Sequence, residues 1–177
     1  MRFDFLPNWK GPTSPELVKA VFGTDRGLPI VAIGAYCFMP NHFHILVREI
    51  TEGGVSSFMQ KLNTAYTMYF NNSRRRTGAL FQGRFKAKHA HSDVYLKYLV
   101  SYIHLNPAKI LEPKWKEQGI KNLKRAEQFL EAYPYSSFPE YLGSKREFTK
   151  ILDRKQFPEY FSTKASFQQC IRDWLTY

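Results

Sequence analysis

Met39–Val47, with the sequence MPNHFHILV, constrains the fold of this chain more than any other stretch. Its Pro-Asn pair favours a turn, and Phe43–Val47 is rich in residues that form buried strands. Alternate side chains of a strand share a face, so His42 and His44 are expected to point the same way. The stretch therefore predicts a sheet that carries a pair of imidazoles on one face.

Two neutral imidazoles on a rigid strand can share a divalent ion and leave positions open for a third ligand, water or phosphate oxygens. Paired histidines also occur as ordinary half-buried polar residues, so the pair alone leaves both interpretations open. A second feature lies at Tyr102 and Asn106, which are four residues apart in a predicted helix and so share a face. Pro107 disfavours helical geometry at Asn106, so the helix is expected to end there.

Several motifs together resemble one protein family, the single-tyrosine HUH transposases of the IS200-like group, and within it the REP-associated tyrosine transposases. The resemblance spans roughly residues 30–143 and is far more specific as a combination than in any one part. Its motifs are PNHFH at 40–44, GALFQGRFK at 78–86, YIHLNP at 102–107, YSS at 135–137 and YLG at 141–143.

The resemblance implies an α+β fold, with a ferredoxin-like antiparallel sheet and helices packed on one face. Residues 1–110 are expected to form the catalytic core, and residues 111–177 a basic helical C-terminal extension packed on it. Members of the family carry a further strand well before the histidine motif, and residues 1–27 contain no convincing match to it. We therefore expect either that Met1–Leu6 has diverged or that the chain is an N-terminally shortened copy.

The resemblance also implies a reaction. His42, His44 and Asn106 are expected to hold Mg²⁺ or Mn²⁺, and Tyr102 to attack a scissile phosphate, leaving a 5′-phosphotyrosine and a free 3′-hydroxyl. The implied substrate is single-stranded or hairpin DNA of the REP type, in the cytoplasm of a prokaryote and associated with its nucleoid. Whether the protein acts as a monomer or a homodimer is left open.

The charge of the chain favours a polyanionic partner. It has 26 Lys and Arg against 15 Asp and Glu, a net charge of +11 and a pI near 9.7. A basic soluble surface or an anionic membrane would fit the charge alone, but an aromatic content of 16% favours unpaired nucleic acid strands. The candidate DNA-binding residues are Arg74, Arg75, Arg76, Gln82, Arg84, Lys86, Lys88 and Lys109.

Composition and periodicity predict the main elements. Residues 28–39 are expected to form a buried strand, because the stretch is short and rich in Val, Ile, Ala, Tyr and Phe. An amphipathic helix is expected over 54–70 that breaks at Asn71–Ser73, and a further helix is expected with Ser92 or Asp93 as its cap. Arg84, Lys86 and Lys88 are expected on one face of a strand, where three cations in line suit a phosphate backbone. Further helices are expected over 15–22, around 123–130 and over 163–174.

Other interpretations remain. Tyr95 and Tyr98 compete with Tyr102, which alone occupies the family's Tyr-x-x-x-Asn-Pro position. His104 is interpreted as structural or DNA-facing, and metal binding by His89 and His91 is not expected. The principal alternative function is a catalytically silent nucleic-acid-binding relic; a small-molecule enzyme of the His-x-His type ranks below it because the accompanying motifs are missing.

The sequence also bears on the protein's surroundings. Cys37 and Cys170 are far apart and form neither a disulfide framework nor a zinc pattern, which fits a reducing compartment. The longest apolar run, Ile30–Met39, is about half the length of a membrane span, so no membrane partner is expected.

Overall fold

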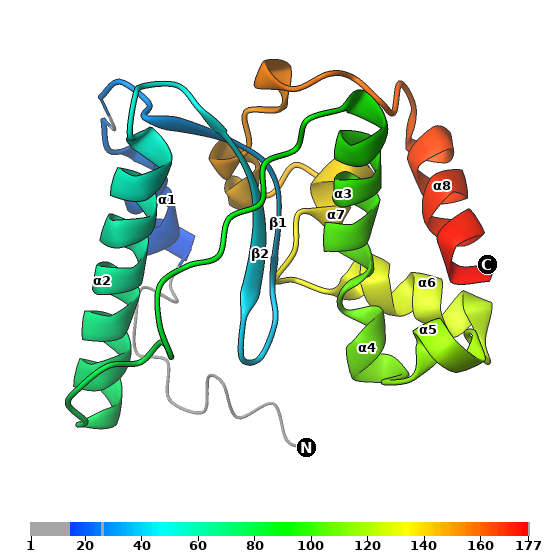
Figure 1. Cartoon of the computed structure of the whole chain (residues 1–177), viewed down its shortest axis with the longest axis horizontal. Helices are drawn as coiled ribbons and strands as arrows, with labels where there is room; N and C mark the ends of the chain where they lie inside the picture. The colour runs from blue at the N-terminus through cyan, green and yellow to red at the C-terminus, as the bar shows by residue number, and fades with distance from the viewer. Residues whose placement is uncertain (1–14, 26, 177) are drawn as a thin grey trace. The chain divides into compact units, whose positions relative to one another are not determined.

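The computed structural model describes residues 15–25 and 27–176 (Figure 1). They form an α+β fold with one two-stranded antiparallel sheet, which confirms the predicted class. The chain divides into two compact units: unit 1 holds the described residues of Met1–Ala32 and Glu49–His89, and unit 2 those of Ile33–Arg48 and Ala90–Tyr177. The boundary near residue 110 stays a prediction, and all four expected catalytic and metal-binding residues lie in unit 2.

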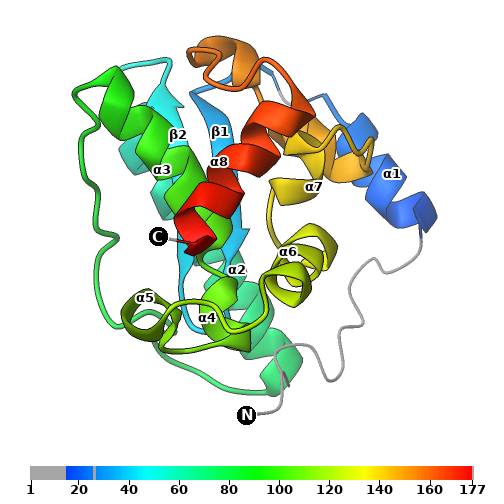
Figure 2. The same ribbon diagram turned by 90° about the vertical axis from the view of Figure 1, so that its right-hand side faces the viewer.

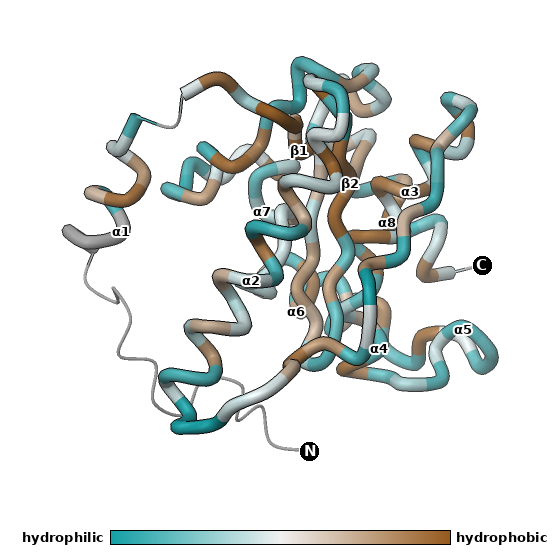
Figure 3. Tube along the Cα trace, turned by 60° about the vertical axis from the view of Figure 1, so that its left-hand side comes forward, coloured by the Kyte–Doolittle hydropathy of each residue, from teal (hydrophilic) through white to brown (hydrophobic). Residues whose placement is uncertain are grey.

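The sheet is a hairpin of β1 (Val31–Phe38) and β2 (Phe43–Glu49). The Met39 N–H donates to the His42 carbonyl at 2.8 Å and closes the turn between the strands. Both strands run through hydrophobic sequence, as Figure 3 shows, and β1 contributes Ala35, Tyr36 and Cys37 to the buried residues. The strands predicted over 28–39 and 43–47 and the turn between them are confirmed, whereas Met1–Leu6 lies outside the described residues.

The free edge of β1 is covered by the chain around the YSS motif. The Phe38 N–H donates to the Tyr135 carbonyl at 2.8 Å, and the Ser137 N–H donates to the Tyr36 carbonyl at 3.0 Å. Cys37 and Ser136 form an antiparallel bridge between these bonds. The backbone of Tyr135–Ser137 therefore pairs with a strand edge that would otherwise expose unpaired backbone groups.

His104 ties the same segment to a helix. Its side chain is fully buried, and its Nε2 lies 2.7 Å from the Ser137 hydroxyl. Burial lowers the pKa of His104 to about 3, so the imidazole stays neutral at pH 7. Rings of Phe138, Tyr141 and Phe167 pack around it with centroids 5.8, 4.7 and 5.4 Å away. Of its two expected roles, the structural one is therefore the one the structure shows.

Unit 2 contains most of the helices. The Ser92 side chain accepts from the Tyr95 N–H and caps α3, and Asn122 caps α6 in the same way through the Arg125 N–H. Helix α8 packs against α3, as Figure 2 shows, and α6 packs against α4, α7 and α8. The helices are α3 (Asp93–Leu105), α4 (Ala108–Leu111), α5 (Trp115–Gln118), α6 (Leu123–Ala132), α7 (Phe138–Tyr141) and α8 (Lys164–Thr176), with 3₁₀ turns η1 (Glu147–Ile151) and η2 (Arg154–Gln156).

Unit 1 contains α1 (Pro15–Gly23) and α2 (Gly54–Arg74). The predicted break of α2 at Asn71–Ser73 is wrong, because the helix continues to Arg74. The Asn71 amide donates to the Gly78 carbonyl at 2.9 Å, and Arg75 adopts the left-handed conformation that ends the helix. Among the described residues, no helix has the length and hydrophobicity that crossing a membrane requires.

The strand expected at Arg84–Lys88 is also wrong. Residues 82–89 are exposed and form neither helix nor strand. The alternation of cations with Phe85 and Ala87 imitates a strand, but Phe85 is 38% exposed and the stretch has no hydrophobic face to bury. A strand also needs a partner for its backbone, which local sequence cannot supply.

A buried ion pair in unit 2 gives a stability prediction. The Glu140 side chain is 2% exposed and receives two hydrogen bonds from Arg146, from Nε at 2.7 Å and from Nη2 at 2.6 Å. Arg146→Met leaves this carboxylate buried without its cation and is expected to lower the free energy of unfolding by about 3 kcal/mol in urea titrations. Arg172→Met, which breaks the more exposed pair with Glu127, is the control and is expected to change it much less. Equal losses would contradict the prediction.

Candidate functional site

His42 and His44 meet at the start of β2. His42 directly precedes the strand and His44 is its second residue, and their ring centroids lie 4.9 Å apart at an interplanar angle of 89°. His42 Nδ1 lies 2.7 Å from the side-chain oxygen of Asn41. Because that oxygen only accepts, Nδ1 carries the hydrogen, and the lone pair of His42 lies on Nε2.

His44 is the less exposed member of the pair. Its Nε2 is buried, and no described residue forms a hydrogen bond with it. Burial, followed by the charges of His42 and Lys109, lowers the pKa of His44 to about 4. Burial and Lys109 also lower the pKa of His42. Both rings are therefore neutral at pH 7, which is the form that binds metals.

Tyr102 lies against the histidine pair. Its ring centroid is 5.5 Å from that of His44, at an interplanar angle of 81°. Tyr95, Tyr98 and Tyr102 follow one another along α3, with ring centroids 6.0 and 5.8 Å apart. Tyr102 therefore joins this row of tyrosines to the histidine pair.

Asn106 follows Tyr102 by one helical turn. It is the C-cap of α3, as predicted, and is 3% exposed. Its side-chain nitrogen donates to the Tyr102 carbonyl at 2.8 Å, which fixes the amide and identifies the other amide atom, the oxygen, as the acceptor. Asn106 and Tyr102 line the same cavity of about 390 Å³.

Two lysines complete the surroundings of Tyr102. Lys109, on α4, lines the same cavity and acts electrostatically on both histidines. The Lys116 ammonium, on α5, lies 4.8 Å from the Tyr102 ring centroid and 5.7 Å from the Trp115 ring. Burial and then Lys109 lower the pKa of Lys116. The sequence did not identify Lys116 as a site residue; it indicated only that Lys116 lies in a basic part of the chain.

This arrangement has the parts of a metal-assisted nucleophilic site: a phenol, neutral imidazoles with available lone pairs, an amide oxygen and two cations. Residues 24–106 match the family model described as transposase IS200 like. Over these residues the chain is similar to the IS200-like transposases. No curated protein and no solved structure matches the chain. The REP-associated branch stays a prediction.

The IS200-like segment includes both histidines, Tyr102 and Asn106. The third expected ligand, beside the two imidazoles, is the side-chain amide of Asn106. Within residues 15–25 and 27–176, no three or more His, Cys, Asp or Glu side chains gather in a way that could hold a metal. The expected ligand set of two imidazoles and the Asn106 oxygen stays a prediction.

Of the predicted DNA-binding residues, only Lys109 lies in unit 2 beside the site. The others belong to unit 1. The guanidinium groups of Arg74 and Arg76 lie over the Phe70 ring at 5.8 and 5.7 Å, and Arg76 also donates to the Ala79 carbonyl. The next candidates along the chain lie in an irregular stretch, and their side chains are exposed: Gln82, Arg84, Lys86 and Lys88.

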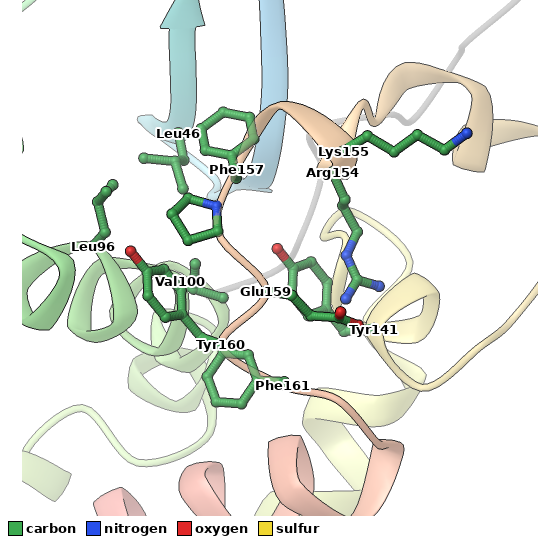
Figure 4. A pocket seen from close by; sticks show the side chains of 11 residues that line it. Leu46, Leu96, Val100, Tyr141, Arg154, Lys155, Phe157, Glu159, Tyr160 and Phe161 are labelled. Carbon is green, nitrogen blue, oxygen red and sulfur yellow. The ribbon is translucent and has the colours of Figure 1, made fainter.

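Unit 2 has a second cavity, of about 560 Å³, which Figure 4 shows. Its walls include Leu46, Val100 and Tyr160, and the Arg154 guanidinium lies 4.0 Å from the Tyr141 ring centroid at its side. None of the described residues that line it was predicted as a site residue of the IS200-like segment. The candidate site is therefore the cavity beside Tyr102.

Proposed function

We propose that the protein is a metal-dependent enzyme that nicks and rejoins single-stranded DNA through a 5′-phosphotyrosine. The observation that carries this proposal is the contact of Tyr102 with His44, whose buried Nε2 has no described hydrogen-bond partner. Similarity to the IS200-like transposases supports a transposase acting on DNA. Hairpin DNA of the REP type is the proposed substrate, and the cytoplasm the proposed location.

The residues present fit a divalent metal. IS200-like transposases generally depend on one, and Nε2 of His42, Nε2 of His44 and the side-chain oxygen of Asn106 would hold Mg²⁺ or Mn²⁺ here. When bound, the ion polarises the scissile phosphate and stabilises its developing charge.

Tyr102 supplies the nucleophile. Its hydroxyl oxygen forms a bond to phosphorus while the bond from phosphorus to the 3′-oxygen breaks; the phenol proton passes to water, and the 3′-oxygen takes up a proton. A tyrosine hydroxyl is a weak nucleophile until it loses its proton, so the attacking oxygen needs help to carry negative charge. The Lys116 ammonium, 4.8 Å from the ring centroid, favours that charge electrostatically.

The cations bind the rest of the strand. Lys109, which lines the cavity beside Tyr102, is proposed to contact a phosphate there. The basic side chains of unit 1 from Arg74 to Lys88 are proposed to contact the DNA backbone. Contacts of this kind position a strand without reading its sequence.

A covalent adduct tests the proposal. The full chain is incubated with a set of single-stranded hairpin DNAs and Mn²⁺, and a band that survives denaturing electrophoresis is expected. A sequence-matched duplex is the control and is expected to give none. If no hairpin forms an adduct while the DNA still binds, the silent nucleic-acid-binding alternative is favoured over the enzyme.

Binding to single-stranded DNA is expected to weaken steeply with salt. Each phosphate neutralised on a single strand releases about 0.7 of a counterion, so the logarithm of the binding constant falls linearly with the logarithm of the salt concentration. Fluorescence anisotropy without metal at several salt concentrations gives the slope. The double variant Arg84→Gln/Lys86→Gln is expected to reduce the slope, and Lys145→Gln to leave it unchanged. A flat response in the unmodified protein would exclude the basic side chains as the main contact.

A further inference from the structure

The cavity beside Tyr102 has a second wall that the proposed reaction does not use. Trp174, on α8, and Tyr98, on α3, line it together, with ring centroids 5.3 Å apart at 59°. Trp174 is 39% exposed, although the other large apolar residues of its helix, Phe167, Ile171 and Leu175, are buried. A large ring left partly open at a cavity wall is available for stacking.

Trp115 provides a second, independent observation. It lines the same cavity and is 7% exposed, yet no described residue accepts a hydrogen bond from its buried Nε1–H. A buried donor without a partner costs free energy, and such groups are rare in folded proteins. An acceptor brought in by a ligand would satisfy it.

The charges at the cavity indicate which kind of ligand this is. Lys109 and Lys116 line it against the single carboxylate of Glu117, so the described lining has a net positive charge. Aromatic rings, a hydrogen-bond donor and cations in one cavity are the groups that bind a nucleotide: the rings stack on the base, the donor bonds one of its acceptors, and the cations contact phosphate.

We propose that this cavity receives the nucleobase next to the scissile phosphate, stacked on Trp174 and bonded by the Trp115 Nε1–H. The inference rests on the proposed function, because it is the position of Tyr102 in the cavity wall that makes the bound base a neighbour of the reacting phosphate. Trp174 and Trp115 are then positioning residues that set where along a strand Tyr102 attacks.

Binding measurements without metal test the pocket separately from the reaction. The probes are a fluorescein-labelled twelve-thymidine strand and a strand of the same length in which every base is replaced by an abasic spacer. Trp174→Ala is expected to weaken binding of the thymidine strand about five- to tenfold and to leave binding of the abasic strand unchanged. Tyr135→Ala, which removes another exposed aromatic ring of unit 2, is expected to affect neither strand.

The double comparison decides the outcome. If Trp174→Ala binds both strands as the unmodified protein does, or weakens both by the same factor, no base stacks on Trp174 and the inference is overturned. Trp115→Phe keeps a ring in the core and removes the N–H, so it is expected to weaken the thymidine strand alone. These measurements involve no cleavage. If no covalent adduct forms, the proposed function is contradicted, but the binding results for Trp174→Ala and Trp115→Phe still test the base pocket.

Discussion

Tyr102→Phe is expected to abolish the covalent protein–DNA adduct. The substitution removes one oxygen and keeps the ring that packs 5.5 Å from His44 and 4.8 Å from the Lys116 ammonium. Loss of a nucleophile lowers turnover on the order of a thousandfold or more, so no adduct should be detected. Denaturing electrophoresis with labelled hairpin DNA and Mn²⁺ measures it, and anisotropy should show unchanged DNA affinity.

The neighbouring tyrosines of α3 provide matched controls. Tyr95→Phe and Tyr98→Phe make the same chemical change on the same helix, where each ring also packs against other rings. Both variants are expected to form the adduct. An adduct from Tyr102→Phe, or its loss in Tyr95→Phe with Tyr102 intact, would show that the nucleophile has been assigned to the wrong tyrosine.

His42→Ala and His44→Ala are each expected to remove measurable Mn²⁺ binding. Each variant deletes one of two imidazoles whose rings lie 4.9 Å apart, and the remaining ring with one amide oxygen makes a poor site for a divalent ion. The loss should exceed the roughly 10- to 100-fold effect typical of residues that only support a ligand. Isothermal titration calorimetry measures it, with circular dichroism to verify the fold.

His89→Ala is the control for these variants. His89 is exposed, belongs to unit 1 and is the first histidine of the chain's other His-x-His pair, His89 and His91. It is expected to bind Mn²⁺ as tightly as the unmodified protein does. Equal Mn²⁺ binding by all three variants would show that His42 and His44 do not form the metal site.

Much of the candidate site could be predicted because its parts are local in sequence. Alternation within Phe43–Val47 was enough to predict β2 with His42 and His44 together, and the spacing of Tyr102 and Asn106 was enough to place them on one turn of α3. Pro107 marked the end of that helix, where the structure also ends it. Each of these inferences used fewer than ten consecutive residues.

The rest depends on contacts that are distant in sequence. Tyr36 and Ser137 bond across 101 positions, and nothing near either residue indicates that pairing. Lys116 reaches Tyr102 from a helix of four residues, too short for periodicity to detect. The strand expected at Arg84–Lys88 is wrong for the same reason, because its alternation had no partner strand. The break expected at Asn71–Ser73 is a more local error: the Asn71 amide, which favoured a break, instead donates to the Gly78 carbonyl seven positions on.

The junction of α3 and α4 makes the length of this stretch as important as its composition. Asn106 and Pro107 separate the helices yet keep helical dihedral angles, so the backbone turns almost without interruption from Tyr102 to Lys109. Each residue in such a path rotates the chain by about 100°. A single codon gained or lost between positions 102 and 109 would swing Lys109 away from the phenol while every residue type remained. A substitution alters one of these residues, whereas an insertion or deletion changes the direction of every side chain that follows it. Residues 102–109 are therefore expected to tolerate substitutions far better than insertions or deletions.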